Sequence, residues 1–286
     1  MAQSLPPTPG IAGLDHAVIA VRDLDAARAT YARMGFKLAP RGVHSTGSMN
    51  HNIMLDKDYI ELLTVPNNNP LQSYFYEYLQ HGEGLAGVAI TGTDLNAAWR
   101  VLHSKGFDPT RPQDFSRPVT QGSRTGTAKF ALANISSYTT PGAQFFICQH
   151  VTRELVWLPE LQKHANGATG IAALAFVADN VAYVAGVYSK LFGKWPERID
   201  EGMKIETGNA PVAVCTRASL QARLAGVELP ARLSSGPRVA AMFIRVRDRQ
   251  VAFKTLKEGG FSPKRLADGS CGVDASAAHG IALVFG

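Results

Sequence analysis

The sequence lacks the features of several large protein classes. No apolar run approaches the roughly 20 residues that a membrane-spanning helix needs, and the opening stretch MAQSLPPTPG has neither the basic nor the apolar region of a secretion signal. The three cysteines, Cys148, Cys215 and Cys271, are far apart and form no CxxC pair, which argues against a disulfide framework and a zinc ribbon. We therefore expect a cytoplasmic protein whose cysteines are reduced and buried.

Basic runs and phosphate-binding loops are also missing. The net charge of +6 is spread along the chain, and the aromatic residues do not alternate with basic ones, so a nucleic-acid partner is not expected. No P-loop, no GxGxxG after a strand and no Ser-His-Asp arrangement is present, which leaves phosphoryl transfer, nicotinamide chemistry and acyl transfer without support. We expect a small-molecule ligand, with no nucleic-acid or membrane partner.

What the sequence does contain is an internal repeat. Its 286 residues, 45% hydrophobic and 18% charged, suit two globular domains. An apolar run ending near an aspartate, then a helical stretch, occurs four times. In three copies the next glycine follows after 12 residues, namely Asp23 and Gly35, Asp94 and Gly106, and Asp248 and Gly260 (35 − 23, 106 − 94, 260 − 248). The remaining copy is looser and has Asp179 at the same interval before Leu191.

The first copy shows what each unit should form. A strand ends before Asp23, which should cap the next helix by accepting hydrogen bonds from its first free amides. The apolar stripe Leu24, Ala27, Tyr31 and Met34 has helical spacing, and the helix should end at Gly35. Three strands are then expected, around residues 36–39, 51–55 and 59–65. The sequence therefore predicts four βαβββ units, each with a helix starting within two residues of its aspartate.

Domain boundaries follow from the spacing of the copies. The polar stretch LQKHANGATG suits a linker, so we expect one half at residues 1–165 and another at 166–286. Residues 66–83 contain the aromatic cluster Tyr74, Phe75, Tyr76 and Tyr78. This segment should be a loop and short helix lying over the mouth of a cavity.

This plan resembles the vicinal oxygen chelate superfamily of glyoxalase-like proteins, which includes bleomycin-resistance proteins and extradiol dioxygenases. The resemblance covers nearly the whole chain and includes the run RGVHSTGSMNHNIMLDKDYIELL. It implies an α+β fold in which four βαβββ units form two glyoxalase-like halves with curved mixed sheets around a cavity. It also implies a divalent metal ion held by a histidine on the first strand of a unit and a carboxylate on the last. His16 in GLDHAVIAV and Glu61 in DYIELLTV match those positions.

The repeat register tests that implication within the chain. The positions equivalent to His16 are Gly87, Ala172 and Ala241, each seven residues before its aspartate. Because small residues satisfy the same position elsewhere, the histidine should have a specific role, although a hydrogen bond to a backbone carbonyl or to Glu61 would also explain it. We expect His16 and Glu61 to converge to roughly 3 to 4 Å on one cavity in the first half.

Other polar residues are candidates for the rest of the site. The second closing strand has no carboxylate but ends in His150, which alternation places on the face of Gln144, Phe146 and Cys148, so it is a candidate third metal ligand. His44, in a glycine-containing loop, is a candidate for substrate contact or proton transfer. His51 and Asn52 are candidates for substrate binding. For both His44 and His150, the alternative is a side chain that is exposed to solvent and has no role in the site.

Two functions stay open from the sequence. The first is a metal-dependent lyase, isomerase or dioxygenase acting on a small molecule with neighbouring oxygens. The second is a non-catalytic small-molecule-binding or resistance protein of the same fold, favoured by the missing second-unit histidine. A scaffold without a ligand would leave His16 and Glu61 unexplained. The metal is not specified by the ligand types, and either a monomer or a homodimer fits four units in one chain.

Overall fold

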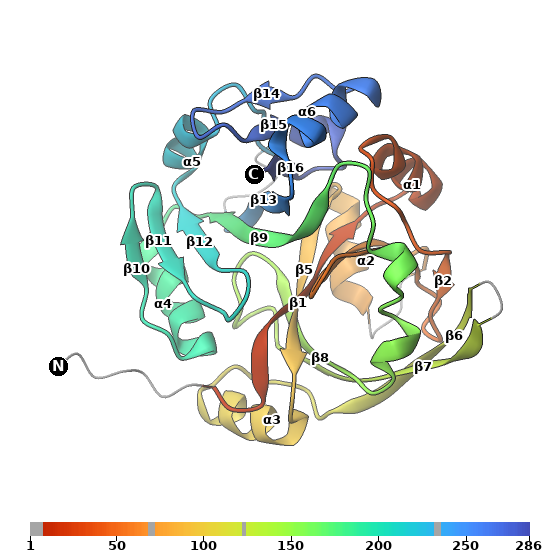
Figure 1. The fold of residues 1–286 in the computed structure, drawn as a ribbon. Helices are drawn as coiled ribbons and strands as arrows, with labels where there is room; N and C mark the ends of the chain where they lie inside the picture. Colours follow the sequence, from red (N-terminus) through yellow and green to blue (C-terminus); the bar gives the residue numbers. More distant parts are fainter. Residues whose placement is uncertain (1–7, 68–71, 122–123, 232–235) are drawn as a thin grey trace.

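Two eight-stranded sheets make up the protein in a computed structural model that describes residues 8–67, 72–121, 124–231 and 236–286 (Figure 1). The first has the order β2-β3-β4-β1-β5-β8-β7-β6 and the second the order β10-β11-β12-β9-β13-β16-β15-β14. The first-sheet strands are β1 (Ile11–Ala20), β2 (Gly42–Val43), β3 (Met49–Met54), β4 (Tyr59–Thr64), β5 (Gly84–Gly92), β6 (Gln113–Gln121), β7 (Arg124–Asn134) and β8 (Gln144–His150). The second-sheet strands are β9 (Ala168–Val177), β10 (Glu197–Ile199), β11 (Gly202–Ile205), β12 (Val212–Cys215), β13 (Arg238–Val246), β14 (Lys264–Arg265), β15 (Cys271–Val273) and β16 (Ala282–Phe285).

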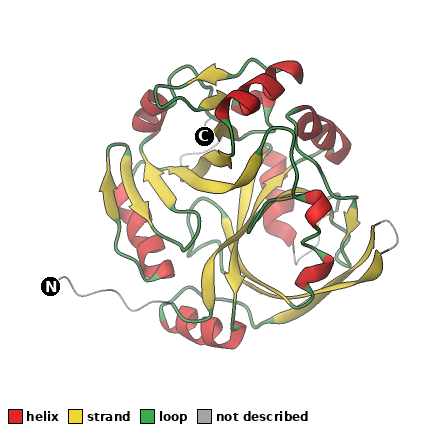
Figure 2. Ribbon diagram, viewed as in Figure 1, coloured by secondary structure: helices red, strands yellow, loops and turns green. Residues whose placement is uncertain are grey.

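The helices follow the repeat. One helix comes after the first strand of each unit: α1 (Leu24–Arg33), α3 (Leu95–Ser104), α4 (Val181–Phe192) and α6 (Arg249–Glu258). The others are α2 (Ser73–His81), α5 (Arg217–Arg223) and the short 3-10 helices η2 (Arg153–Leu155), η3 (Pro159–Leu161) and η4 (Ala275–Ala277). Helices α3 to α6 lie at the outside of the molecule (Figure 2). None of the helices described is long and apolar enough to cross a membrane.

The predicted four-unit α+β fold is confirmed, with each repeat helix starting within two residues of its aspartate. The carboxylates of Asp23, Asp94 and Asp248 accept backbone hydrogen bonds as N-caps. In the third unit the cap is Asn180, whose side chain accepts from the amide of Tyr183. The repeat register is therefore shifted by one residue there.

This shift corrects one predicted equivalence. On β1, Val18 pairs with Glu61 and Gly87, and on β9 the residue that pairs with Ala213 and Ala241 is Ala175. Val18 and Ala175 both precede their caps by five residues (23 − 18, 180 − 175). The counterpart of His16 in the third unit is consequently Ala173 rather than Ala172, so the unit still offers no histidine there.

A second correction concerns the first short strand of the first unit. Residues 36–39 do not form a strand, and the strand at this place is β2, at residues 42–43. The backbone amide of Ala39 still donates to the carbonyl of Asn52, but the stretch makes no ladder. Phe36 is instead buried in the core. The apolar side chain at this position therefore contributes to core packing and does not belong to a strand.

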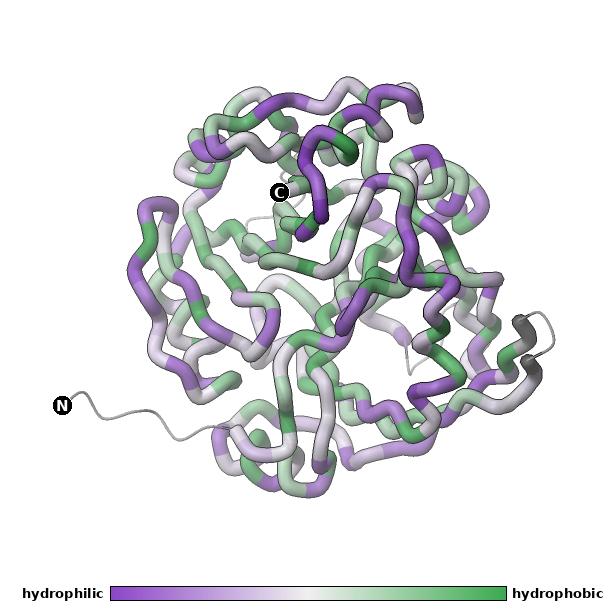
Figure 3. Tube along the Cα trace, in the orientation of Figure 1, coloured by the Kyte–Doolittle hydropathy of each residue, from purple (hydrophilic) through white to green (hydrophobic). Residues whose placement is uncertain are grey.

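The two sheets share one hydrophobic core. Buried side chains from both sequence halves belong to the same cluster, for example Tyr31 of α1, Phe145 of β8 and Phe176 of β9. The Tyr31 hydroxyl donates to the carbonyl of Ala278 across this boundary. Figure 3 shows hydrophilic stretches of α1 and α6 at the outer edge, where these helices meet solvent. The halves are therefore packed against each other, with their outer helix faces in water.

The curved face of the second sheet is filled by side chains, whereas that of the first sheet encloses a cavity. In the second sheet, Leu220 of α5 and Leu224, the C-cap residue of this helix, pack with Val227 and Leu229 on small residues such as Ala241 and fill that face. The first sheet curls until its end strands β2 and β6 lie against each other without pairing in the described residues. It forms a nearly closed barrel around a cavity.

Candidate metal and substrate cavity in the first half

The cavity inside the first sheet has a volume of about 230 Å³. Side chains from β1, β3, β4, β6, β7 and β8 line it, together with Phe75 of α2. The segment predicted to lie over a cavity mouth therefore does contact the cavity. Its polar wall includes His16, Glu61, Asn50 and Asn52, which lie on the neighbouring strands β1, β4 and β3.

His16 and Glu61 converge, as the family resemblance led us to expect. Both line the cavity, and His16 Nε2 lies 3.6 Å from Glu61 Oε2. His16 Nδ1 lies 2.7 Å from Asp15 Oδ1, which makes Nδ1 the protonated nitrogen that donates to this carboxylate. The other ring nitrogen, Nε2, faces the Glu61 carboxylate. Two electron-pair donors at this separation match two ligands at about 2.1 Å from one divalent ion, so the residues fit such an ion.

Asp15 reaches the site because β1 is irregular. The pairing of β1 with β5 shifts between Leu14 and His16, and Asp15 is the unpaired residue between them. Its Oδ1 accepts from His16 Nδ1 and from His150 Nε2 at 3.0 Å. Burial disfavours its charge, but the hydrogen bonds from His150 and His16 outweigh it and hold the pKa of Asp15 well below its ordinary value. Asp15 is thus an ionised carboxylate behind the cavity wall.

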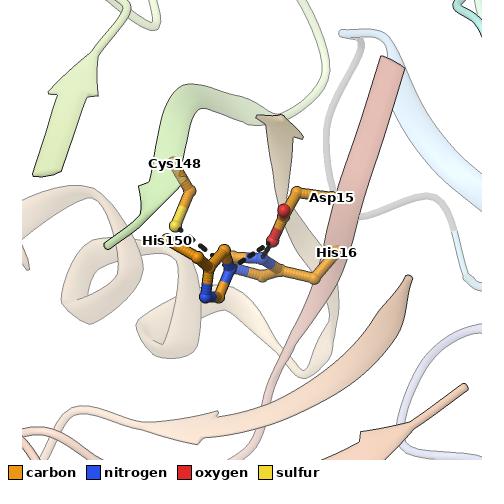
Figure 4. A group of neighbouring side chains, drawn as sticks. All are labelled: Asp15, His16, Cys148 and His150. Atoms are coloured by element: carbon orange, nitrogen blue, oxygen red, sulfur yellow. Dashed lines mark hydrogen bonds and ion pairs between the residues drawn. The ribbon is translucent and has the colours of Figure 1, made fainter. Parts of the chain in front are cut away.

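His150 lies behind Asp15 and does not line the cavity. Asp15, His16, Cys148 and His150 nevertheless form a group whose ligand atoms lie within 4.8 Å of one another and which could hold an ion (Figure 4). Burial, reinforced by the charges of Asp15 and Glu61, raises the pKa of the Cys148 thiol well above its ordinary value. Cys148 is therefore a neutral thiol unless a metal displaces its proton. The ligand role of His150 stays a prediction.

A chain of amides and hydroxyls holds His44 at the cavity. Asn50 Nδ2 donates to Glu61 Oε1 at 2.5 Å and lies 3.2 Å from His44 Nε2. His44 Nδ1 lies 2.7 Å from Ser48 Oγ, which also accepts from Gln72 Nε2. Burial lowers the pKa of His44, and the nearby Glu61 offsets only part of that effect. His44 is therefore a neutral imidazole whose Nε2 lone pair faces Asn50 and the cavity.

The residues of β3 separate by alternation. Asn50 and Asn52 line the cavity, and Asn52 Oδ1 accepts from Asn50 Nδ2. His51 lies on the opposite face, where its Nδ1 donates to the carbonyl of Ala39. The structure therefore does not bring His51 to the substrate cavity, because successive side chains on a strand point to opposite faces.

Phenylalanines occupy the second half of the pseudo-symmetric site. The register of β5 and β8 makes Gly87 the residue equivalent to His16 in the second unit, and Phe146 the residue equivalent to Glu61. A Cβ at Gly87 would lie 2.9 Å from the Phe75 ring, so Phe75 fills the space that a second histidine would need. The cavity accordingly has aromatic side chains at the places that correspond to a second histidine and a second carboxylate.

Sequence reasoning assigned no role to Asp15, Phe75 or Arg117, whereas Asn50, like Asn52, was a candidate for orienting a polar substrate. Asp15 carried a usable signal, since a carboxylate beside His16 in an apolar strand needs a partner. Asn50 and Phe75 stood in segments that the sequence did associate with the cavity. Arg117 gave no signal, because its position depends on how far the sheet curls.

Comparison with solved structures agrees with this fold. A hypothetical protein from Staphylococcus aureus has a TM-score of 0.67 at 15% identity, with 96% of this chain and 98% of that chain covered. A mutant of 4-hydroxymandelate synthase from Streptomyces coelicolor has a TM-score of 0.62 at 11% identity, covering 96% and 92%. A fusion of a xylose isomerase-like TIM barrel with 4-hydroxyphenylpyruvate dioxygenase has a TM-score of 0.57 at 15% identity, covering 98% and 49%. No match was found among curated proteins.

The paired βαβββ units and a match to a family model together place the chain in the vicinal oxygen chelate superfamily. A family model described as a glyoxalase-like domain matches residues 14–192. The match covers more than half of the chain and includes the entire first sheet from Leu14. The chain belongs to the glyoxalase-like domain family.

Proposed function

We propose that the protein is a metal-dependent enzyme that acts on a small molecule with two neighbouring oxygens, by lyase, isomerase or dioxygenase chemistry. The observation that carries the proposal is the pair formed by His16 Nε2 and Glu61 Oε2, 3.6 Å apart on the cavity wall. An unprotonated imidazole nitrogen beside a carboxylate is a favourable arrangement when a cation lies between them. Asp15 supports it by holding the other nitrogen of His16.

The residues around the pair have distinct roles in this proposal. His16 and Glu61 would hold the ion, which when bound supplies Lewis-acid stabilisation of negative charge on the substrate. His44 would move a proton at its Nε2, since its Nδ1 is committed to Ser48. Asn52 would donate to a substrate oxygen. The apolar wall would exclude water from the reacting atoms.

Metal content is the test. We expect the purified protein to contain about one ion per chain, His16→Ala to lose it and Glu61→Gln to bind it more weakly, as measured by elemental analysis and by titration with Mn²⁺ and Zn²⁺. His103→Ala and Glu77→Gln are matched controls, because both side chains are exposed on helices and neither lines the cavity. Full metal content in His16→Ala would rule out the proposal.

The same titrations separate the two ligand sets. If the ion is held by the group of Asp15, His16, Cys148 and His150, then Cys148→Ser should weaken its binding and Glu61→Gln should not. If the cavity pair holds it, the order is reversed. This comparison also tests His150, since His150→Ala should lose metal only in the first case.

A second candidate is a non-catalytic binding protein with the same cavity. Phe75 and Phe146 favour it, because they occupy the places where a second histidine and a second carboxylate would complete a symmetric set of metal ligands. Such a protein would bind its ligand equally well with and without added metal.

The proposed active half is residues 1–165, with residues 166–286 as a degenerate copy retained for packing. The filled face of the second sheet and the absence of a histidine at Ala173 and Ala241 support this division. The proposed assembly is a monomer or a homodimer in the cytoplasm. Size-exclusion chromatography with light scattering distinguishes the two assemblies.

A further inference from the structure

The cavity carries a fixed positive charge whose role the proposed chemistry does not explain. Among the described residues that line it, Arg117 is the one arginine or lysine. It lies on β6, at the end of the curled sheet, and it is half-buried. A Cβ added at Gly42 of β2 would lie 3.4 Å from its Nη1, so the guanidinium reaches across the junction between the two end strands.

Arg117 makes no hydrogen bond or ion pair with any residue that the structure describes. Other arginines near the first sheet are engaged: Arg41 pairs with Asp25, and Arg153 stacks on Trp157 at 3.4 Å. Its guanidinium is available to a ligand, since Arg117 lines the cavity. A half-buried guanidinium has five donors in a planar fork that matches a carboxylate. The unused donors therefore point to an anionic partner that enters the cavity.

The other walls limit what that partner can be. Phe75, Phe115, Phe130 and Phe146 contribute aromatic surface, and the Phe115 ring contacts His44 edge-on at 5.0 Å between centroids. A ligand for this cavity therefore needs an apolar body, and the volume of about 230 Å³ restricts it to a small molecule.

The charges of the cavity wall determine where an anionic group of the ligand can bind. Glu61 is at the His16 end of the cavity and would repel a carboxylate there unless the ion is bound. Asp114 also lines the cavity but is exposed, so water screens its charge more strongly. Arg117 is consequently the favourable position for an anionic group.

We propose that the substrate is a small carboxylic acid with an apolar, ring-sized body, and that Arg117 is the specificity residue that binds its carboxylate. The body packs on the phenylalanine wall, and the reacting oxygens lie toward His16 and Glu61. This assignment rests on the proposed function for its reacting end. The carboxylate contact itself requires only Arg117 and the cavity.

Matched acids and amides test the carboxylate contact. Phenylacetate and phenylacetamide differ in charge but hardly in shape, and acetate lacks the ring. We expect calorimetric titration of the full chain to show phenylacetate binding at least about tenfold more tightly than either of the others, as a charge-assisted hydrogen bond predicts. Arg117→Gln should abolish the difference between acid and amide, and Arg117→Lys should retain part of it. Arg28→Gln, which removes the same charge from the exposed face of α1, should leave it unchanged.

Titrations with chelator-treated and Mn²⁺-loaded protein separate this inference from the proposed function. Acid binding that depends on Arg117 in protein that takes up no metal would support the specificity role and remove the enzyme proposal. Metal bound through His16, with acid and amide binding equally or with the preference intact in Arg117→Gln, would overturn the role of Arg117 and leave the enzyme proposal standing. No binding of any probe to folded wild-type protein would also overturn it. Thermal melting of each variant establishes that it is folded.

Discussion

Asp58 should make the stability of this protein decrease as the pH rises through the mildly acidic range. The residue lies in the turn between β3 and β4 and is buried. Its Oδ1 accepts from the amide of Ile171 and its Oδ2 from Asn209 Nδ2 at 3.3 Å, so it connects the first sheet to the second. Burial is the largest influence and raises the pKa of Asp58 from 3.8 to about 6, despite the Ile171 amide and the charge of Arg245, while Asp15 adds to the increase.

The size and sign of the effect follow from this pKa. Because the folded protein holds the Asp58 proton more tightly than the unfolded chain, stability is lost between about pH 4 and pH 6 and is constant above. A shift of about two pKa units corresponds to about 3 kcal/mol. Asp58→Asn removes the titration, so the unfolding free energy of the wild type minus that of the variant should fall by about 3 kcal/mol over this range.

Urea denaturation at several pH values between 4 and 7 measures this difference. Urea is preferable to guanidinium chloride, whose ions would screen the charges. Asp56→Asn is the matched control, since its exposed carboxylate lies two residues away in the same turn. A difference between the wild type and Asp58→Asn that stays constant from pH 4 to pH 7 would refute the reasoning.

Three further changes have defined outcomes. Asp15→Asn should weaken metal binding about 10- to 100-fold in a Mn²⁺ titration, because the amide cannot hold His16 as the carboxylate does; unchanged affinity would contradict that role. Leu224→Ala should lower the unfolding free energy by about 2 to 5 kcal/mol by opening a space on the second sheet, without changing metal content. Asn180→Ala should cost about 1 kcal/mol of stability in the same urea assay through loss of the α4 cap, and a neutral result would argue against the corrected register.

The repeat made the fold predictable from sequence, because local signals recurred with constant spacing. Asp23 and its counterparts cap helices through contacts within three residues, and such contacts need no knowledge of the rest of the chain. The slip in the third unit arose where two capping residues, Asp179 and Asn180, are adjacent and either satisfies the pattern. Spacing alone cannot distinguish them, whereas strand pairing does.

The candidate site was predictable where the family resemblance or alternation determined it. The resemblance brought His16 and Glu61 together, and alternation applied strictly to β3 separates His51 from Asn52. Asp15 breaks alternation through an irregularity in β1, so periodicity would have placed it on the wrong face. Arg117 depends on long-range curvature, and no local pattern reports that.

The first sheet has two end strands, β2 and β6, and the barrel closes where they meet. Every other neighbouring pair in the first sheet is connected by backbone hydrogen bonds, so widening the barrel there would break a ladder. At this junction the described residues form no ladder, and Arg117 lies beside Gly42. Widening the barrel at this junction would therefore break no backbone ladder of the described residues, whereas the ladders of β3, β4 and β1 hold the wall that carries His16 and Glu61.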